Sequence, residues 1–249
     1  MALAITRENF FWHKVHSLTG IIPVGFYMVQ HLTLNSFSLT SAAKFNSVGQ
    51  WFEALPKHLF LLLEIGAIWL PLLFHSIYGI FITNRGQQNL LTTKYRWSQN
   101  RMYTMQRWSG IFIFFYLAYH VATTTAYRMW LEWRGVPDAH RVVEYAAWHA
   151  KLTSFGGLFL VIYMLGILAC SYHLAYGIWN FCIRWGITIT ERAQHRIQKF
   201  SLAAFVGITL LGWGALYGFV FPRNPGDVQA EPIQAATTVS PTTVSNPVP

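Results

Sequence analysis

The chain has 249 residues, of which 53% are hydrophobic, 17% aromatic and only 11% charged. Soluble domains usually carry about 25% charged residues, so this composition argues against a soluble domain and favours a membrane protein. The formal net charge is +9, which in a membrane protein is explained by basic loops that anchor the helices rather than by nucleic-acid binding.

Five apolar segments follow one another along the chain, and each is long enough to cross a bilayer. A transmembrane helix needs about 20 mostly apolar residues, and stretches free of Asp, Glu, Lys and Arg supply them. The predicted spans are residues 16–37, 59–82, 106–128, 154–181 and 199–221. We therefore expect residues 1–221 to form an all-α integral membrane bundle of five transmembrane helices. Residues 222–249, rich in Pro, Thr and Ser, are expected to form a disordered tail.

The distribution of basic residues predicts the orientation of this bundle. If the N-terminus lies inside, the inner segments carry more of the Lys and Arg residues than the outer segments do. The positive-inside rule then places the N-terminus in the cytoplasm and the C-terminus outside. Pro23 and Pro71 fall inside the first two spans, and we expect both to kink their helices.

Each of the first four spans carries one histidine just past its midpoint. The four are His31, His75, His120 and His173. Burying an unpartnered polar group costs roughly 2–7 kcal/mol, so histidines at this depth tend to be functional and to face the bundle interior. Because alternate helices run in opposite directions, the first and third histidines lie toward the outer face, and the second and fourth toward the inner face. At 1.5 Å per residue, these two layers are about 10–18 Å apart.

Two histidines in each layer suit haem better than another metal. Haem iron needs only two axial ligands because the porphyrin supplies the other four, whereas zinc or copper would need further protein ligands. Single membrane histidines can also act as hydrogen-bond donors between helices. Four at matched depths, with almost no other ionisable residue nearby, favour the ligand role. The pattern predicts two stacked bis-histidine haems.

Short motifs around the histidines support the same pairing. An H-x-x-Y-G-I motif begins at both inner-layer histidines and has its glycine at Gly79 and Gly177. Residues four apart share one face of a helix, so we expect these glycines to let a flat macrocycle approach the backbone. A tyrosine stands four residues before each outer-layer histidine, at Tyr27 and Tyr116.

The chain resembles the five-helix, di-haem cytochrome b anchors of succinate dehydrogenase and quinol:fumarate reductase (complex II), over about residues 9–221. The segments that carry the resemblance are H-S-L-T-G-I-I-P-V-G at 16–25, Q-H-L at 30–32, F-N-S-V at 45–48, L-P-L-L-F-H-S-I-Y-G at 70–79, M-Q-R-W-S-G at 105–110, Y-H-V at 119–121 and H-L-A-Y-G-I-W-N-F-C at 173–182. In that family the axial histidines lie on the first four helices. Their positions correspond to His31, His75, His120 and His173, paired first with third and second with fourth.

The resemblance implies a role in electron transfer within an enzyme complex. It implies two b-type haems, a quinone for which the family favours menaquinone, and two soluble partners. One partner is a flavoprotein that carries FAD and oxidises succinate, and the other is an iron–sulfur subunit. This chain has neither a dinucleotide-binding glycine motif nor a cysteine cluster, so succinate chemistry lies on a partner chain. The expected location is a bacterial cytoplasmic membrane, in contact with lipid and not with nucleic acid.

Two alternatives remain open at this point. One is the haem subunit of another membrane dehydrogenase, such as formate dehydrogenase or hydrogenase, and the ordered set of motifs argues against it. The other is a transporter without redox chemistry, in which polar histidines gate a pathway. An absorbance spectrum with a reducible Soret band would exclude the transporter.

Glu64 is the only carboxylate, lysine or arginine well inside any predicted span, and it lies at the depth of His31. A carboxyl group at that depth is expected to be neutral or linked to water. We assign it a candidate catalytic role, the transfer of protons to or from quinone near the outer haem. A structural hydrogen bond to a neighbouring helix has equal weight.

Five polar residues gather at the inner boundary of the predicted bundle. They are Lys14, His16, Ser17, Arg101 and Arg107. They lie where the carboxylates of the inner haem are expected to emerge, and arginine pairs well with carboxylates. Anchoring by positive charge explains most of them equally well.

Overall fold

The computed structural model describes residues 7–85 and 98–228, and in these two ranges it contains helices and no strand. The expected all-α class is therefore confirmed for the described part of the chain. Four stretches in it are long and apolar enough to cross a membrane. They are His58–Arg85, Asn100–Trp133, Tyr145–Arg184 and Glu191–Val220. These four contain the second, third and fourth predicted spans and all but the last residue of the fifth, and the first predicted span is not among them.

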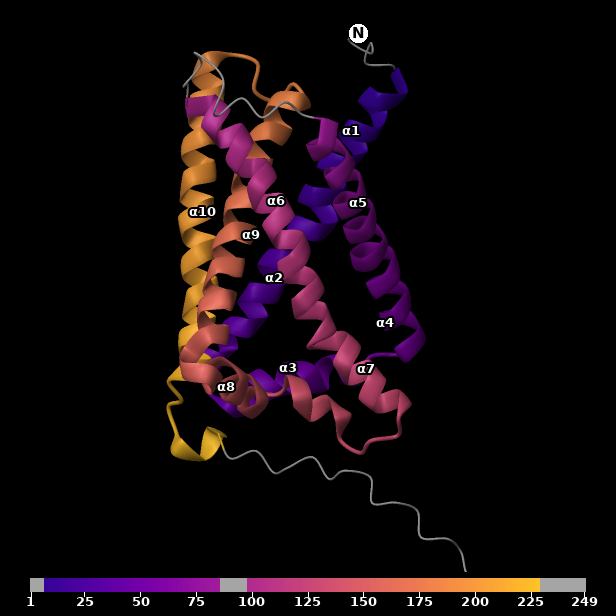
Figure 1. The fold of residues 1–249 in the computed structure, drawn as a ribbon, viewed down its shortest axis with the longest axis vertical. Coiled ribbons are helices and arrows are strands. Elements are labelled where there is room, and N and C mark those ends of the chain that lie inside the picture. The colour runs from indigo at the N-terminus through magenta and orange to yellow at the C-terminus, as the bar shows by residue number, and fades with distance from the viewer. Residues whose placement is uncertain (1–6, 86–97, 229–249) are drawn as a thin grey trace, which may run out of the picture.

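The first predicted span lies within a continuous helical run over residues 7–39. The run consists of α1 (Arg7–Thr19), the π-helical segment η1 (Gly20–Gly25), α2 (Phe26–Asn35) and the 3-10 segment η2 (Ser36–Leu39). Gln30, His31 and Asn35 reduce its mean hydropathy. Figure 1 nevertheless shows this run passing through the bundle, from the end that holds the N-terminus to the end that holds α3 and α8. We call these the N-terminal end and the far end.

Both prolines inside the first two spans lie in or just after a π-helical turn. Pro23 lies within η1, and Pro71 follows closely after the π-helical segment η3 (Glu64–Trp69). Proline has no backbone N–H, and its ring clashes with the carbonyl group four residues earlier. A widened turn relieves that clash and is a usual cause of a kink. The η3 segment joins α4 (Lys57–Leu63) to α5 (Leu70–Arg85).

The third predicted span, 106–128, is wrong at its far end because the helix breaks there. Helix α6 covers Ser98–Ala122, and α7 begins only at Thr125 and ends at Trp133. Between them, Thr124 has a non-helical backbone conformation (φ −124°, ψ −94°). The Thr124 hydroxyl donates to the carbonyl oxygen of His120 at 2.5 Å. Such bonds from threonine side chains to the backbone compete with the helical pattern.

The fourth helix also starts later than predicted. A short helix, α8 (Tyr145–Thr153), comes first, and α9 runs from Leu158 to Arg184. Between them, Phe155, Gly156 and Gly157 all have positive φ. The chain can make this reversal because two of the three residues are glycines, which adopt the left-handed region freely.

Helix α9 lies at the centre of the bundle. It packs against α6, α8, α1 and η1, and most extensively against α10 (Glu191–Val220). Its buried residues include Tyr163, Ile167, Ser171, Leu174 and Ala175. Large apolar side chains such as those of Phe26, Leu62, Phe115 and Leu210 are exposed on other helices. A membrane protein presents such a surface to lipid.

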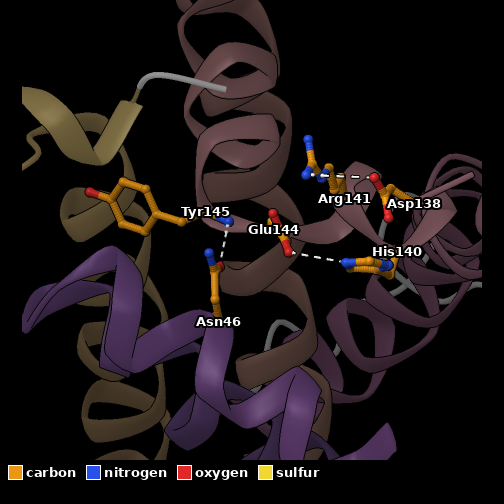
Figure 2. Close-up of polar contacts among 6 residues, drawn as sticks. All are labelled: Asn46, Asp138, His140, Arg141, Glu144 and Tyr145. Carbon is orange, nitrogen blue, oxygen red and sulfur yellow. Dashed lines mark hydrogen bonds and ion pairs between the residues drawn. The ribbon is translucent and has the colours of Figure 1, made fainter. Parts of the chain in front are cut away.

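Polar contacts tie the helices together at the far end (Figure 2). Asn46, on α3 (Ala42–Glu53), accepts a hydrogen bond through its Oδ1 from the backbone N–H of Tyr145 at 3.0 Å. This satisfies one of the free N–H groups at the start of α8. Glu144 faces His140 at 3.5 Å, and Arg141 faces Asp138 at 3.5 Å. These contacts order the connection through η4 (Ala139–Val143) that leads into α8.

The predicted disordered tail is described only at its beginning. Residues Pro225–Val228 form the 3-10 segment η6, which packs against α8 and α3. Residues 229–249 lie outside the described part of the chain.

Candidate functional site

The four predicted ligand histidines form two facing pairs. His31 on α2 and His120 on α6 have ring centres 6.0 Å apart, with an angle of 79° between the ring planes. His75 on α5 and His173 on α9 have ring centres 6.1 Å apart, with an angle of 90°. We call His31 and His120 the far-end pair, because His120 contacts Trp148 of α8 at the far end. We call His75 and His173 the near-end pair, because His75 contacts His16 of α1 toward the N-terminal end. The structure thus brings together the same partners that the depth argument predicts.

The backbone and a serine hold the near-end pair in place. The His75 Nδ1–H donates to the carbonyl oxygen of His16 at 2.9 Å. The His173 Nδ1–H points to the carbonyl oxygen of Gln106 at 3.1 Å, and the Ser109 hydroxyl lies 3.2 Å from the same nitrogen. A proton on Nδ1 leaves the Nε2 lone pair free to bind a metal, and such hydrogen bonds fix the orientation of a ligand ring.

The far-end pair is held by aromatic rings. Tyr27 stacks on His31 with 5.6 Å between ring centres, and Tyr116 stacks on His120 at 6.1 Å. This confirms that each tyrosine shares a helix face with the histidine four residues later. In addition, the Nδ1 of His120 lies 3.2 Å from the hydroxyl oxygen of Tyr163 on α9.

Both pairs have a ring separation that is compatible with two imidazoles binding one metal atom between them. Two metal–imidazole bonds of about 2 Å, plus roughly 1.1 Å from nitrogen to ring centre on each side, place the ring centres about 6.2 Å apart. The observed separations are 6.0 and 6.1 Å. In the described part of the chain, no group of three or more His, Cys, Asp and Glu side chains could hold a metal ion. Two-ligand sites of this kind suit haem iron and are incomplete for zinc.

Two glycines, Gly20 and Gly110, lie against the rings of the near-end pair, whereas the two glycines of the sequence motif do not contact these rings. A Cβ at Gly20 would collide with the ring of His75, and one at Gly110 would lie 3.1 Å from Cε1 of His173. By contrast, Gly79 faces His16, and a Cβ at position 79 would lie 3.2 Å from Cε1 of that histidine. A Cβ at Gly177 would make only ordinary contacts of 3.7 Å with Gln106 and Ile21.

The near-end boundary holds further polar groups beside this pair. The ring of His16 stacks on that of His75 at 4.1 Å between centres, with only 13° between planes. The His16 Nδ1 and Gln106 Oε1 atoms are buried without a hydrogen-bond partner. Unpaired buried polar atoms are rare in folded proteins and indicate a polar partner. Carboxylate or carbonyl groups of a cofactor would suit the His16 nitrogen.

The other predicted boundary residues lie apart from this cluster. The Ser17 hydroxyl accepts a hydrogen bond from Trp185 Nε1 at 3.1 Å, and the Lys14 ammonium lies over the Trp185 ring at 4.8 Å. Arg107 packs on the ring of Tyr103 at 4.1 Å, and Arg101 is exposed. Of the five polar residues predicted at this boundary, His16 is the one whose contact with a histidine of the near-end pair is seen directly.

Glu64, the predicted proton carrier, lies on the same helical stretch as His75, at its earlier part. It is the first residue of η3 and is partly buried. Its carboxyl group interacts electrostatically with Tyr27, whose ring stacks on His31, and with Arg128 of α7.

Sequence reasoning missed five residues that contact the histidines directly. Gly20 and Gly110 lie against the near-end rings, Gln106 and Ser109 hold His173, and Tyr163 adds a fifth contact at His120. The two glycines were detectable, because each lies in its span at about the same depth as the histidine that it contacts.

Fold and site together define an α-helical membrane protein whose interior carries two facing histidine pairs. Paired interior histidines of this kind are typical of membrane cytochromes b.

Comparison with known proteins identifies the family. The chain is 32% identical over 215 residues to the succinate dehydrogenase cytochrome b558 subunit of Bacillus subtilis (strain 168). The match covers 86% of this chain and 98% of that protein. No family model and no solved structure matches the chain. The chain belongs to the family of succinate dehydrogenase cytochrome b subunits, which disfavours a formate dehydrogenase subunit, a hydrogenase subunit and a transporter.

Proposed function

We propose that the chain is the membrane anchor of a succinate dehydrogenase and passes electrons through two b-type haems to a membrane quinone. The observation that carries the proposal is that the four interior histidines form two pairs. In each pair the ring separation suits two imidazoles that would hold one iron. His75 and His173 would hold one haem, and His31 and His120 would hold the other. Succinate oxidation belongs to a flavoprotein partner with FAD, and an iron–sulfur partner delivers the electrons.

The bundle would cross a bacterial cytoplasmic membrane five times. Four helical stretches have the required hydropathy, and the run over residues 7–39 passes through the same bundle (Figure 1). Its polar residues Gln30 and His31 are accounted for if the helix faces a cofactor rather than lipid. With the N-terminus in the cytoplasm, the near-end pair lies on the side of the soluble partners. The far-end pair then lies toward the outside.

Bound haem supplies a one-electron carrier that alternates between ferric and ferrous iron. The residues of this chain set the position and the surroundings of that carrier. The carbonyl oxygens of His16 and Gln106 fix the near-end rings through Nδ1, which would leave the Nε2 atoms of His75 and His173 free to hold the iron. Gly20 and Gly110 remove the side chains that would push these rings aside.

Quinone reduction also requires protons, and Glu64 is the residue that we assign to this task. Its carboxyl group is near enough to interact electrostatically with Tyr27, whose ring stacks on His31. A carboxyl group can exchange protons with water near the membrane boundary. The family resemblance favours menaquinone as the acceptor.

Purification of the intact complex tests the proposal. We expect the flavoprotein and iron–sulfur subunits to co-purify with this chain, and pyridine haemochrome analysis to give two haem b groups per chain. Succinate should reduce haem b in the complex, as measured by absorbance. A single haem per chain, or haem that succinate never reduces, would contradict the proposal.

A further inference from the structure

Lys151, near the end of α8, is a partly buried cation surrounded by aromatic rings. Its Nζ lies 5.3 Å from the ring centre of Tyr119, 5.0 Å from that of Trp148 and 5.3 Å from that of Tyr163. Lysine is costly to bury and rarely buried without a partner. Lys151 lies beside the far-end pair but has no role in the proposed electron transfer. Its position therefore requires an explanation.

A chain of hydrogen bonds joins this lysine to a ligand histidine. The Lys151 ammonium donates to the hydroxyl oxygen of Thr123 at 2.8 Å and to that of Tyr163 at 3.1 Å. The same Tyr163 oxygen lies 3.2 Å from Nδ1 of His120. Tyr163 is only 3% exposed, so water does not compete strongly for these bonds.

The position of Lys151 is set by the packing of α8. Two residues before it, the His149 Nδ1–H donates to the carbonyl oxygen of Phe219 on α10 at 2.8 Å. At the start of the helix, Asn46 holds the backbone of Tyr145 (Figure 2). Leu152, which follows Lys151, is fully buried. The ammonium is therefore placed by a fixed helix and not by a flexible loop.

We propose that Lys151 acts through Tyr163 on His120 and raises the midpoint potential of the haem at the far-end pair. The inference rests on the proposed function, because it assumes that His31 and His120 hold a haem. When Nε2 of His120 binds iron, Nδ1 must carry the proton and donate it to the Tyr163 oxygen. Lys151 donates to the same oxygen and so makes it a poorer acceptor. The imidazole then donates less electron density to the iron, which favours the ferrous state.

The near-end pair shows the contrast. His75 and His173 donate to the neutral backbone carbonyl oxygens of His16 and Gln106. Neither of these acceptors is shared with a lysine in the described part of the chain. The two haem sites therefore differ in the charge connected to their ligands, and Lys151 is a positioning residue for one site only.

Redox titration of the purified complex tests the proposal, with absorbance or electron paramagnetic resonance as the readout. In Lys151→Gln we expect the midpoint potential of one haem component to fall and that of the other to stay unchanged. Lys151→Arg keeps the charge and should stay close to wild type. Lys44→Gln is the matched control, because Lys44 is exposed and lies over the Phe37 ring. An unchanged potential in Lys151→Gln would overturn the proposal.

Tyr163→Phe shows whether the effect passes through the tyrosine. Tyr163→Phe alone should shift the midpoint potential of the same haem component. When Lys151→Gln is added to Tyr163→Phe, the midpoint potential should fall much less than it does when Lys151→Gln is introduced into wild type. Unchanged potentials in Tyr163→Phe would overturn the relay. Equal falls in both backgrounds would overturn it too, since Lys151 would then act directly on the haem carboxylates. Haem content shows which of the two proposals fails. A wild-type complex without a far-end haem would contradict the proposed function. Variants that keep two haems with unaltered midpoint potentials would contradict the relay alone.

Discussion

Gly20 lies directly against the ring of His75, so close that no side chain fits between them. The contact joins η1, the π-helical turn at Pro23, to the middle of α5. Gly110 on α6 has the same relationship to His173 on α9, with 3.1 Å between a built Cβ and Cε1. Each histidine of the near-end pair thus rests on a glycine of a neighbouring helix.

Gly20→Leu and Gly110→Leu should therefore displace the ligand rings and reduce haem occupancy at the near-end pair. The leucine side chain would occupy the space of the imidazole, and close-packed interiors do not absorb such volume without movement. Haem content per chain and the loss of one component in redox titration measure the effect. Gly207→Leu is the control, because a Cβ there meets nothing within 4 Å. Full haem content in both test variants would show that these contacts do not shape the site.

Gly177→Leu distinguishes the structural contacts from the sequence motif. The built Cβ at Gly177 contacts Gln106 and Ile21 only at 3.7 Å, so we expect a smaller loss of haem than in Gly110→Leu. The same haem assay on both variants makes the comparison. A larger loss in Gly177→Leu would instead support a role for the motif glycine in the close approach of the macrocycle to the backbone.

Glu64→Gln should keep both haems and normal succinate oxidation with an artificial acceptor that takes electrons before the membrane subunit. Electron transfer to quinone should fall sharply, because glutamine keeps the shape of the side chain but cannot exchange a proton. The ratio of quinone-linked to artificial-acceptor turnover measures the effect. A ratio equal to that of wild type would mean that Glu64 has a structural role and that protons take another path.

Asn46→Ala should lower the stability of the far end by about 1 kcal/mol, the usual cost of losing a side-chain acceptor at a helix start. The variant removes the hydrogen bond to the Tyr145 N–H that links α3 to α8. Thermal unfolding of the purified complex measures the change, and Asn46→Asp, which keeps an acceptor oxygen, should restore most of the loss. Identical transition temperatures for wild type and Asn46→Ala would show that this contact contributes nothing.

The sequence predicts the helices and the pairing of the histidines because both depend on simple periodic quantities. Hydropathy locates the apolar stretches, and the position of each histidine along its span determines its layer. The breaks at Thr124 and at Phe155–Gly157 escape such reasoning, because all these residues lie in or beside apolar stretches. At these breaks, the helices are ended by local hydrogen bonds and backbone conformation, and not by a change in the hydropathy of the sequence.

Contacts between helices are also beyond the reach of sequence periodicity. The pairing of Gly20 with His75, or of Tyr163 with His120, depends on how helices distant in sequence rotate against one another. The H-x-x-Y-G-I motif identifies residues on the same face as a histidine. It does not identify the residue on the opposite helix that the histidine meets.

The pairing of the four histidines is the central claim, and redox titration of four single variants tests it most directly. His31→Leu and His120→Leu should each abolish one and the same haem component, while His75→Leu and His173→Leu should abolish the other. This follows from the ring separations of 6.0 Å in the far-end pair and 6.1 Å in the near-end pair. If His31→Leu and His75→Leu instead removed the same component, the pairing, and with it the two-haem path across the membrane, would be wrong.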